Sequence, residues 1–217
     1  MRNTILTITP NPSLDLSGVV DGIKLNEKTY VHDETRAPGG NAINVARILN
    51  RMGYPVCASG FLGGSVGDEV ASLLEVENVA QHFVRTRGST RINITVSDRK
   101  DHRQTRLSFA GPSIQSDEIS KLMKLVQTFS TKVLVVGGSL PPHFYMRDLQ
   151  KLIEIAQRRH IDVVVDCPGE ILRGVASSGL LLIKPNLDEF QKMTQSHVRT
   201  VSCLLYTSPS PRDLSTS

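Results

Sequence analysis

Several polar residues and glycines in this sequence are of types that bind hydroxyl or phosphate groups. Asp15 comes shortly after an expected strand at residues 4–9. An ionised carboxylate accepts hydrogen bonds through two oxygens, so Asp15 could bind two hydroxyls of a polyol. The alternative is a turn aspartate that follows Pro12, and the spacing alone favours that interpretation.

The segment Pro-Gly-Gly-Asn at residues 38–41 stands directly before a helical pattern. Gly39 and Gly40 lack a Cβ and would let a ligand touch the main chain, while free amides at the start of a helix favour negative charge. Such a ligand would be a nucleotide phosphate or a sugar. The alternative is a loop in which Asn41 caps the helix, and taken alone that simpler interpretation is preferred.

Two further motifs and one aspartate follow expected strands in the second half of the chain. Gly-Gly-Ser-Leu-Pro-Pro at 137–142 would form a rigid loop that exposes amides and the Ser139 hydroxyl, or would simply end a strand. Lys-Pro-Asn-Leu-Asp-Glu at 184–189 offers a cation, Lys184, and a carboxylate, Glu189. Asn186 and Glu189 also fit a capping pair at a helix start. Asp166 ends an apolar strand.

The elements that would position these residues alternate in type along the chain. Apolar strands are expected at residues 4–9, 56–63, 132–138, 162–166 and 180–184. Helices are expected from residue 42 to Gly53 and at 68–75, 116–128, 145–158, 170–177 and 187–194. This alternation predicts a parallel sheet covered on both faces by helices. Ligands of such sheets bind beyond the carboxyl ends of the strands, where the polar residues above would meet.

A hairpin interrupts this pattern. Ile92, Ile94 and Val96 alternate with polar residues, and residues 105–111 repeat the alternation after a polar turn, which predicts antiparallel strands with one wet face. Shorter alternating pieces lie at residues 16–20 and 29–33. Basic residues crowd into this region: Arg85, Arg87, Arg91, Arg99, Lys100, Arg103 and Arg106. A solvated basic tip and a binding site for an anionic ligand fit that cluster equally well.

The composition argues against several classes of protein. The 217 residues carry a formal net charge of +4, with 39% hydrophobic and 21% charged residues, as expected for one main domain. No apolar run approaches the roughly 20 residues of a membrane span and the start does not suit a secretory signal, so we expect a cytoplasmic protein that binds no membrane. The basic residues lack interleaved aromatic rings, which argues against nucleic acid as a partner. The scattered cysteines and histidines predict neither a disulfide nor a metal centre made of protein ligands alone.

The last fifteen residues differ from the rest of the chain. From Cys203 onward the sequence is rich in Ser, Thr and Pro without periodicity, as in a disordered tail. The letters CLLYTSPSPRD also resemble a translated adapter from a sequencing library. We therefore expect one domain at residues 1–202, incomplete at its C-terminus, and a non-native tail at residues 203–217.

The motifs NPSLD, PGGNAINVAR, TRINI, GGSLPP, VVVD and KPNLDE follow one another in an order that resembles the PfkB branch of the ribokinase-like sugar kinases. The resemblance, to the phosphofructokinase and tagatose-6-phosphate kinase group, covers residues from about 4 to 193. It implies a ribokinase-like three-layer α/β fold with a mostly parallel central sheet and a small antiparallel β lid, at about 16–35 and 85–110. It also implies transfer of a phosphoryl group from ATP, with Mg²⁺, to fructose 6-phosphate, fructose 1-phosphate or tagatose 6-phosphate. A homodimer formed through the lid is a further implication.

The resemblance also implies roles for individual residues. Contacts to the sugar would come from Asp15, Gly39, Gly40, Asn44 and Asn93, and contacts to the phosphate of the substrate from Lys28 and Arg91. Ser139 would belong to an active-site loop. Asp166 and Glu189 would lie at the Mg²⁺ region, and Lys184, Asn186 and Glu189 near the phosphates of ATP. The glycines at 39 and 40 would then line the sugar and not the nucleotide.

One motif of the family is missing from the sequence. The Gly-Ala-Gly-Asp segment, which supplies the anion hole and the catalytic aspartate base in this family, does not occur, so the base is unassigned and we expect the chain itself to be inactive. The variant Gly-Gly-Asn-Ala at 39–42 also resembles ribokinase and the nucleoside kinases. A kinase for an unphosphorylated sugar or nucleoside is therefore the nearest alternative. A non-catalytic sugar-binding protein on the same fold is the other.

Overall fold

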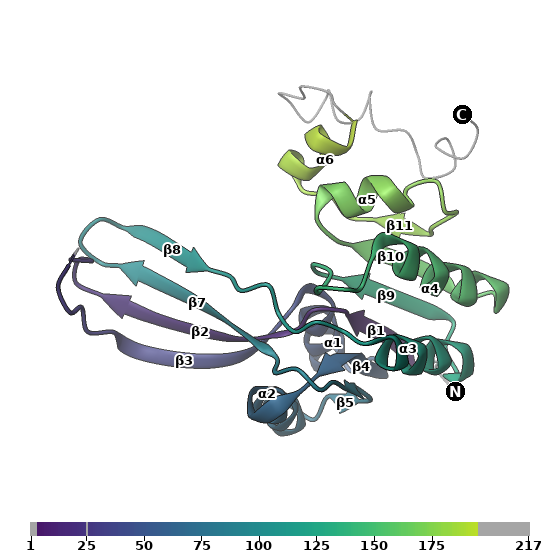
Figure 1. Cartoon of the computed structure of the whole chain (residues 1–217), viewed down its shortest axis with the longest axis horizontal. Helices are drawn as coiled ribbons and strands as arrows, with labels where there is room; N and C mark the ends of the chain where they lie inside the picture. Colours follow the sequence, from purple (N-terminus) through teal and green to yellow (C-terminus); the bar gives the residue numbers. More distant parts are fainter. Residues whose placement is uncertain (1–3, 25, 195–217) are drawn as a thin grey trace.

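A central sheet and a second sheet that projects from it make up the fold in Figure 1, which draws a computed structural model of the chain. The structure describes residues 4–24 and 26–194. The end of the predicted domain at residue 202 and the predicted tail at 203–217 lie outside these residues.

The central sheet contains the five apolar strands that the sequence predicts and two short strands that it does not, β5 (Ala80–Gln81) and β6 (Val84–Arg85). The five predicted strands are β1 (Ile5–Thr9), β4 (Val56–Leu62), β9 (Val133–Gly137), β10 (Asp162–Asp166) and β11 (Leu182–Ile183). Their order is β11-β10-β9-β1-β4-β5, with β6 also paired to β4, and every pairing is parallel. The prediction of a parallel sheet is confirmed. All these strands therefore present their carboxyl ends at one edge.

Helices cover both faces of this sheet. They are α1 (Asn41–Arg51), α2 (Gly64–Val76), α3 (Ser116–Thr128), α4 (Met146–Arg158), α5 (Gly169–Val175) and α6 (Leu187–Thr194). One apolar cluster joins the sheet to α3, α4 and α5 through Leu122, Leu149 and Leu172. A second cluster joins the other face to α1 and α2 through Ile43 and Val70. No helix among the described residues is long and apolar enough to cross a bilayer.

The second sheet, called the lid below, consists of β2 (Ser13–Val20), β3 (His32–Gly39), β7 (Arg91–Asp98) and β8 (Arg103–Leu107). Its order is β3-β2-β7-β8, and its two hairpins, β2–β3 and β7–β8, are antiparallel. The middle pair, β2 and β7, is parallel, so the lid is a mixed sheet and differs in this respect from the predicted antiparallel lid. The pairing is parallel because β2 and β7 both run outward from the central sheet, as Figure 1 shows.

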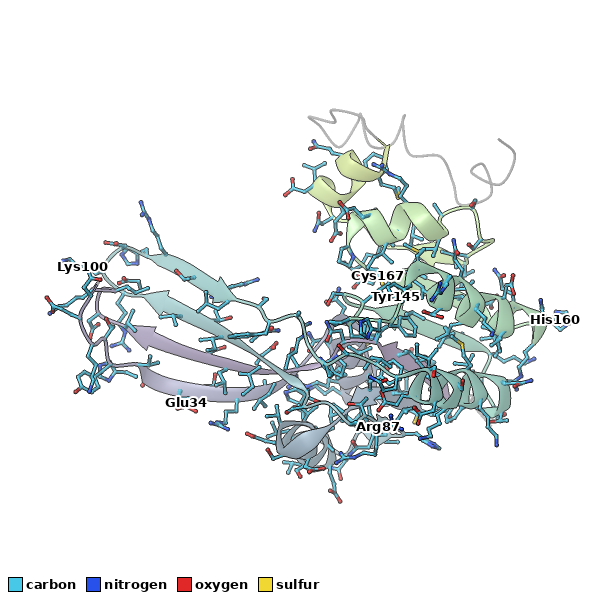
Figure 2. All side chains as sticks on the ribbon, viewed as in Figure 1. Glu34, Arg87, Lys100, Tyr145, His160 and Cys167 are labelled. Carbon is cyan, nitrogen blue, oxygen red and sulfur yellow. The ribbon has the colours of Figure 1, made fainter. Side chains whose placement is uncertain are left out.

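A buried carboxylate holds the far tip of the lid together. Asp98, at the end of β7, accepts hydrogen bonds from the backbone N–H groups of Gly22 (3.0 Å), Ile23 (3.0 Å) and Lys100 (2.9 Å). Figure 2 labels Lys100 at this tip. Burial alone would raise the pKa of Asp98, but the backbone donors outweigh burial and lower the pKa below its usual value. One ionised side chain thus links the turn after β2 to the turn after β7.

Replacing Asp98 with asparagine should loosen the tip of the lid at pH 7, because Asp98→Asn removes the charge that these amides bind. In the unchanged protein the stabilisation is complete above the unfolded pKa of about 3.9 and is lost as the pH falls through the lowered folded pKa. Amide hydrogen exchange at Gly22 and Ile23 should therefore be faster in the variant at pH 7, and the difference should shrink in strong acid. Asp101→Asn, at the same turn, is the control. Equal protection of these amides in both variants at pH 7 would contradict this role of Asp98.

Candidate active site

Asp15 belongs to a strand and not to a turn. β1 ends at Thr9, only three residues intervene, and β2 already begins at Ser13. The interpretation of Asp15 as a turn aspartate is therefore wrong. The alternation of Ser13, Asp15 and Ser17 with Leu14 and Leu16 is the local signal that could have shown this strand.

One oxygen of the Asp15 carboxylate is held by two neighbouring side chains. Ser13 Oγ donates to Asp15 Oδ1 at 2.7 Å, and Asn93 Nδ2 donates to the same oxygen at 3.0 Å. Asn93 Nδ2 also donates to Ser13 Oγ at 2.9 Å, and Asn93 lies opposite Asp15 in the β2–β7 ladder. The other oxygen, Oδ2, has no hydrogen-bond partner in residues 4–24 or 26–194. The structure thus presents a fixed, half-buried carboxylate with one oxygen available to a donor.

Gly39 is required by the position of this carboxylate. Gly39 pairs with Ser13 in the β2–β3 ladder, and a Cβ on Gly39 would come within 2.4 Å of the Asp15 carboxylate atoms. No real Cβ contact is that short, so any side chain at position 39 must displace Asp15. The space beside Gly39, where the sequence analysis expected a ligand to touch the main chain, is occupied by the Asp15 carboxylate.

The next glycine brings helix α1 close to the end of β1. Gly40 has a φ of 123° and is the N-cap of α1, and a Cβ on it would lie 2.4 Å from Thr9 Cγ2. Thr9 Oγ1 accepts a hydrogen bond from the N–H of Ile43 at 2.9 Å and so satisfies one amide of the first helical turn. Asn41 makes no capping bond, and its Nδ2 donates instead to the carbonyl oxygen of Asp166 at 3.2 Å. The interpretation of Asn41 as the helix cap is wrong.

Arg91 lies at the base of the lid beside the Asp15 network. Its Nη1 donates to the carbonyl of Phe109 at 2.9 Å and its Nη2 to the carbonyl of Asn11 at 3.0 Å. Its Nε is buried and has no partner in the described part of the chain. Burial lowers the pKa of Arg91, and the nearby charge of Asp15 partly offsets this effect. A half-buried cation whose Nε–H has no acceptor therefore lies near the carboxylate.

Asn11 is a site residue that the sequence argument did not single out. Its Nδ2 donates to the carbonyl of Ala110 at 2.9 Å and to Ser139 Oγ at 3.1 Å, which ties the loop after β9 to the chain that leaves the lid. Its Oδ1 is buried without a partner, and a Cβ on Gly111 would lie 2.3 Å from that oxygen. An asparagine between two prolines directly after β1 was the available signal.

A second polar group lies along the same edge of the central sheet. The last residue of β10, Asp166, pairs its Oδ1 with Lys184 Nζ at 3.2 Å, and its carbonyl accepts the N–H of Gly138 at 2.9 Å. Asn186 and Glu189 form the capping pair of α6, with Glu189 Oε2 accepting from the Asn186 N–H at 2.8 Å and Asn186 Oδ1 from the Glu189 N–H at 2.9 Å. The capping interpretation of this motif is confirmed. Within the described ranges, no three His, Cys, Asp or Glu side chains group closely enough to hold a metal ion.

Not every residue that was predicted to contact the substrate lies beside Asp15. Lys28 is exposed in the connection between β2 and β3 at the far end of the lid, with its ammonium 5.9 Å from the centroid of the Tyr30 ring. Asn44 is exposed on the first turn of α1, and its Oδ1 accepts a long hydrogen bond of 3.4 Å from Arg47. Lys28 therefore lies at the opposite end of β2 from the carboxylate that it was expected to accompany.

The basic cluster of the sequence is dispersed in the structure. Arg85 pairs with Asp68 at 2.7 Å, and Arg87 pairs with Asp117 at 3.4 Å on the side of the central domain. Arg99 pairs with Asp33 at 2.7 Å near the tip of the lid. Of the seven basic residues in that cluster, Arg91 is the one whose charge interacts with Asp15. The others form surface pairs or solvated positions, as the simpler interpretation of the cluster predicts.

Comparisons with known proteins place these features in a family. A sequence model of the pfkB family of carbohydrate kinases matches residues 11–205. Phosphofructokinase-2 from Escherichia coli in complex with fructose-6-phosphate is 31% identical, with a TM-score of 0.88, over 94% of this chain and 68% of that one. The same enzyme in complex with substrates and products has 30% identity and a TM-score of 0.91, over 96% and 68%. Its tetrameric inhibited form has 31% identity and a TM-score of 0.87, over 94% and 68%.

The contact between Gly39 and Asp15 can be tested with a double-mutant cycle. Gly39→Ala should lower the free energy of unfolding by about 1–3 kcal/mol, because the new methyl group overlaps the Asp15 carboxylate. In an Asp15→Ala background the obstacle is gone, so the same substitution should cost much less. Urea unfolding of the four proteins measures the coupling. Additive costs would show that Gly39 does not hold the position of Asp15.

Proposed function

Because the chain belongs to the pfkB family of carbohydrate kinases, we propose that the Asp15 site binds the sugar that accepts a phosphoryl group from ATP. The acceptor proposed is a phosphorylated ketohexose: fructose 6-phosphate, fructose 1-phosphate or tagatose 6-phosphate. The observation that carries the proposal is the Asp15 carboxylate, of which Ser13 and Asn93 hold one oxygen and leave the other available. The similarity to a phosphofructokinase that was crystallised with fructose-6-phosphate supports this choice of substrate.

Asp15 is suited to select a polyhydroxylated ligand. An ionised carboxylate only accepts hydrogen bonds, and sugar hydroxyls are its natural donors. Because Ser13 and Asn93 already fix its orientation, little side-chain freedom is lost when a sugar binds. Gly39 allows β3 to approach this carboxylate without a side chain in between, and Gly40 allows the start of α1 to approach Thr9 at the end of β1.

Arg91 is the proposed contact to the phosphate that the substrate already carries. Its two Nη groups are held by backbone carbonyls, while its Nε has no acceptor within the described residues. A phosphate oxygen would give this donor a charged acceptor, and hydrogen bonds of this kind are among the strongest in proteins. An unphosphorylated sugar or a nucleoside would leave the half-buried cation without that partner.

The proposed nucleotide side of the site comprises Lys184, Asn186 and Glu189, with Asp166. Carboxylate oxygens suit Mg²⁺, which takes few protein ligands and completes its octahedron with phosphate and water oxygens. Asp166 and Glu189 offer such oxygens and could hold the ion, which when bound would neutralise charge on the transferred phosphoryl group. Lys184, paired with Asp166, would add a cation for the phosphates of ATP.

The catalytic base is proposed to lie in the Gly-Ala-Gly-Asp segment of the family, which this sequence does not contain. We therefore expect no turnover by the 217-residue chain on its own. Ligand binding and assembly of this chain can be measured without activity.

The substrate proposal is tested by the affinities of Arg91 variants for fructose 6-phosphate and fructose. Calorimetry should show at least about a tenfold loss for fructose 6-phosphate in Arg91→Ala, as expected when one charged hydrogen bond of 1.5–3 kcal/mol is lost, and little change for fructose. Arg91→Lys keeps the charge but not the planar guanidinium group. Its affinity for fructose 6-phosphate should therefore lie between those of the unchanged chain and Arg91→Ala. Asp15→Asn should weaken both ligands.

Arg106→Ala, on an exposed position of the lid, is the matched control and should change neither affinity. Equal losses for the two sugars in Arg91→Ala would favour the kinase for an unphosphorylated substrate. Unchanged affinities in Asp15→Asn would reject the assignment of the sugar site itself.

We also propose a homodimer formed through the apolar face of the lid. Ile94 and Val96 are half-buried on this face, and Leu107, which pairs with Ile94, is 52% exposed. Ile92, on the same face, is also half-buried and packs against the apolar cluster of α1 and α2. The face beyond α2 thus offers apolar side chains to a second copy of the chain.

Charging this face should separate the copies. Ile94→Asp should give monomers in light scattering, because a carboxylate buried in an interface without a partner is costly. Thr95→Asp places the same charge on the opposite face of β7 and should leave the dimer intact. A dimer that persists in Ile94→Asp, or a monomer in both variants, would reject this interface.

A further inference from the structure

A pocket with no residue in common with the Asp15 site lies at the lateral edge of the central sheet. Its volume is about 420 Å³, and it lies between the short edge strands and the second half of α3. Its lining consists of His82, Phe83, Val84, Arg85, Lys121, Lys124, Leu125, Thr128 and Phe129. A volume of this size accommodates a small organic ligand.

The apolar part of the lining lies where the two cores of the domain meet. Phe83 packs against the cluster that α1 and α2 form, whereas Phe129 packs against the cluster beneath α3 and α4. Val84 and Leu125 are buried members of this latter cluster. Two phenylalanine rings and two aliphatic side chains therefore offer an apolar surface for a planar group.

The charged part of the lining is basic throughout. The pocket has no aspartate or glutamate in its lining, but it has Arg85, Lys121 and Lys124, together with His82. Arg85 and Lys121 form exposed ion pairs outside the lining, with Asp68 at 2.7 Å and Asp117 at 3.3 Å. Such surface pairs contribute about 0–1 kcal/mol, so a bound anion can compete for these cations. Lys124 has no ion pair in the described part of the chain.

We propose that this pocket is a second binding site, for an aromatic ring that carries a phosphate group. The ring would lie against Phe83 and Phe129, and the phosphate would bind Lys124 together with Arg85 and Lys121. Neither part alone would suffice, because an uncharged ring leaves the cations unpaired and inorganic phosphate leaves the apolar surface in water. A ligand held this way joins α3 to β6 and stabilises the folded chain by mass action.

The direct test is calorimetric titration of the 217-residue chain with phenyl phosphate, inorganic phosphate and phenol. Phenyl phosphate should bind at least about tenfold more tightly than either fragment. Lys124→Glu should weaken phenyl phosphate at least about tenfold, while Lys151→Glu, an exposed lysine on α4 with the same charge change, should have no effect. Fructose 6-phosphate at saturation should not displace the probe.

Three results would overturn the proposal: no preference for phenyl phosphate over its fragments, equal effects of the two lysine variants, or displacement of the probe by fructose 6-phosphate. AMP and pyridoxine 5′-phosphate, which has no aldehyde to condense with lysine, then separate two sources of the same chemistry, a nucleotide and a phosphorylated pyridine. The tighter of the two identifies the source, provided that Lys124→Glu weakens its binding. Retained binding of both in Lys124→Glu would place them elsewhere and count against the pocket.

Discussion

The packing of the Asp15 carboxylate against the backbone of Gly39 is the constraint on which the rest of the site depends. A Cβ at position 39 would come within 2.4 Å of that carboxylate, so Asp15 can keep this position beside the β2–β3 ladder only because Gly39 has no side chain. Two more glycines near the end of β1 have no room for a Cβ, because the backbone of Gly40 packs against the side chain of Thr9 and that of Gly111 against the side chain of Asn11. These close approaches fix the lid, the start of α1 and the carboxyl edge of the sheet relative to one another.

Local periodicity was sufficient to predict most of the elements. The spacing of apolar residues in the strands and helices follows from which side chains are buried. The helices α3 and α6 begin and end at the predicted residues. The parallel pairing of β2 with β7 could not be predicted in this way, because it joins strands almost eighty residues apart and leaves no local signature. An alternating piece was expected at residues 16–20, but the first three residues of β2, which include Asp15, were missed for a different reason, since Asn11 and Pro12 have the composition of a turn.

The predicted site was partly visible in the sequence for a physical reason. In a parallel sheet the residues after the strands meet at one edge, so Ser139, Asp166 and Lys184 could be expected together without knowledge of their contacts. Partners distant in sequence could not be foreseen: Asn41 binds the carbonyl of Asp166 and does not cap its helix. The basic residues show the opposite case, because residues that are close in sequence lie in different parts of the lid and the central domain. Of the seven, Arg91 is the one whose charge interacts with Asp15.

The central claim is that Asp15 binds the hydroxyls of a sugar whose phosphate reaches Arg91. A crystal structure of this chain with fructose 6-phosphate tests it most directly. The account predicts sugar hydroxyls within hydrogen-bond distance of Asp15 Oδ2 and a phosphate oxygen within hydrogen-bond distance of Arg91 Nε. A sugar bound away from Asp15, or a phosphate bound away from Arg91, would contradict it.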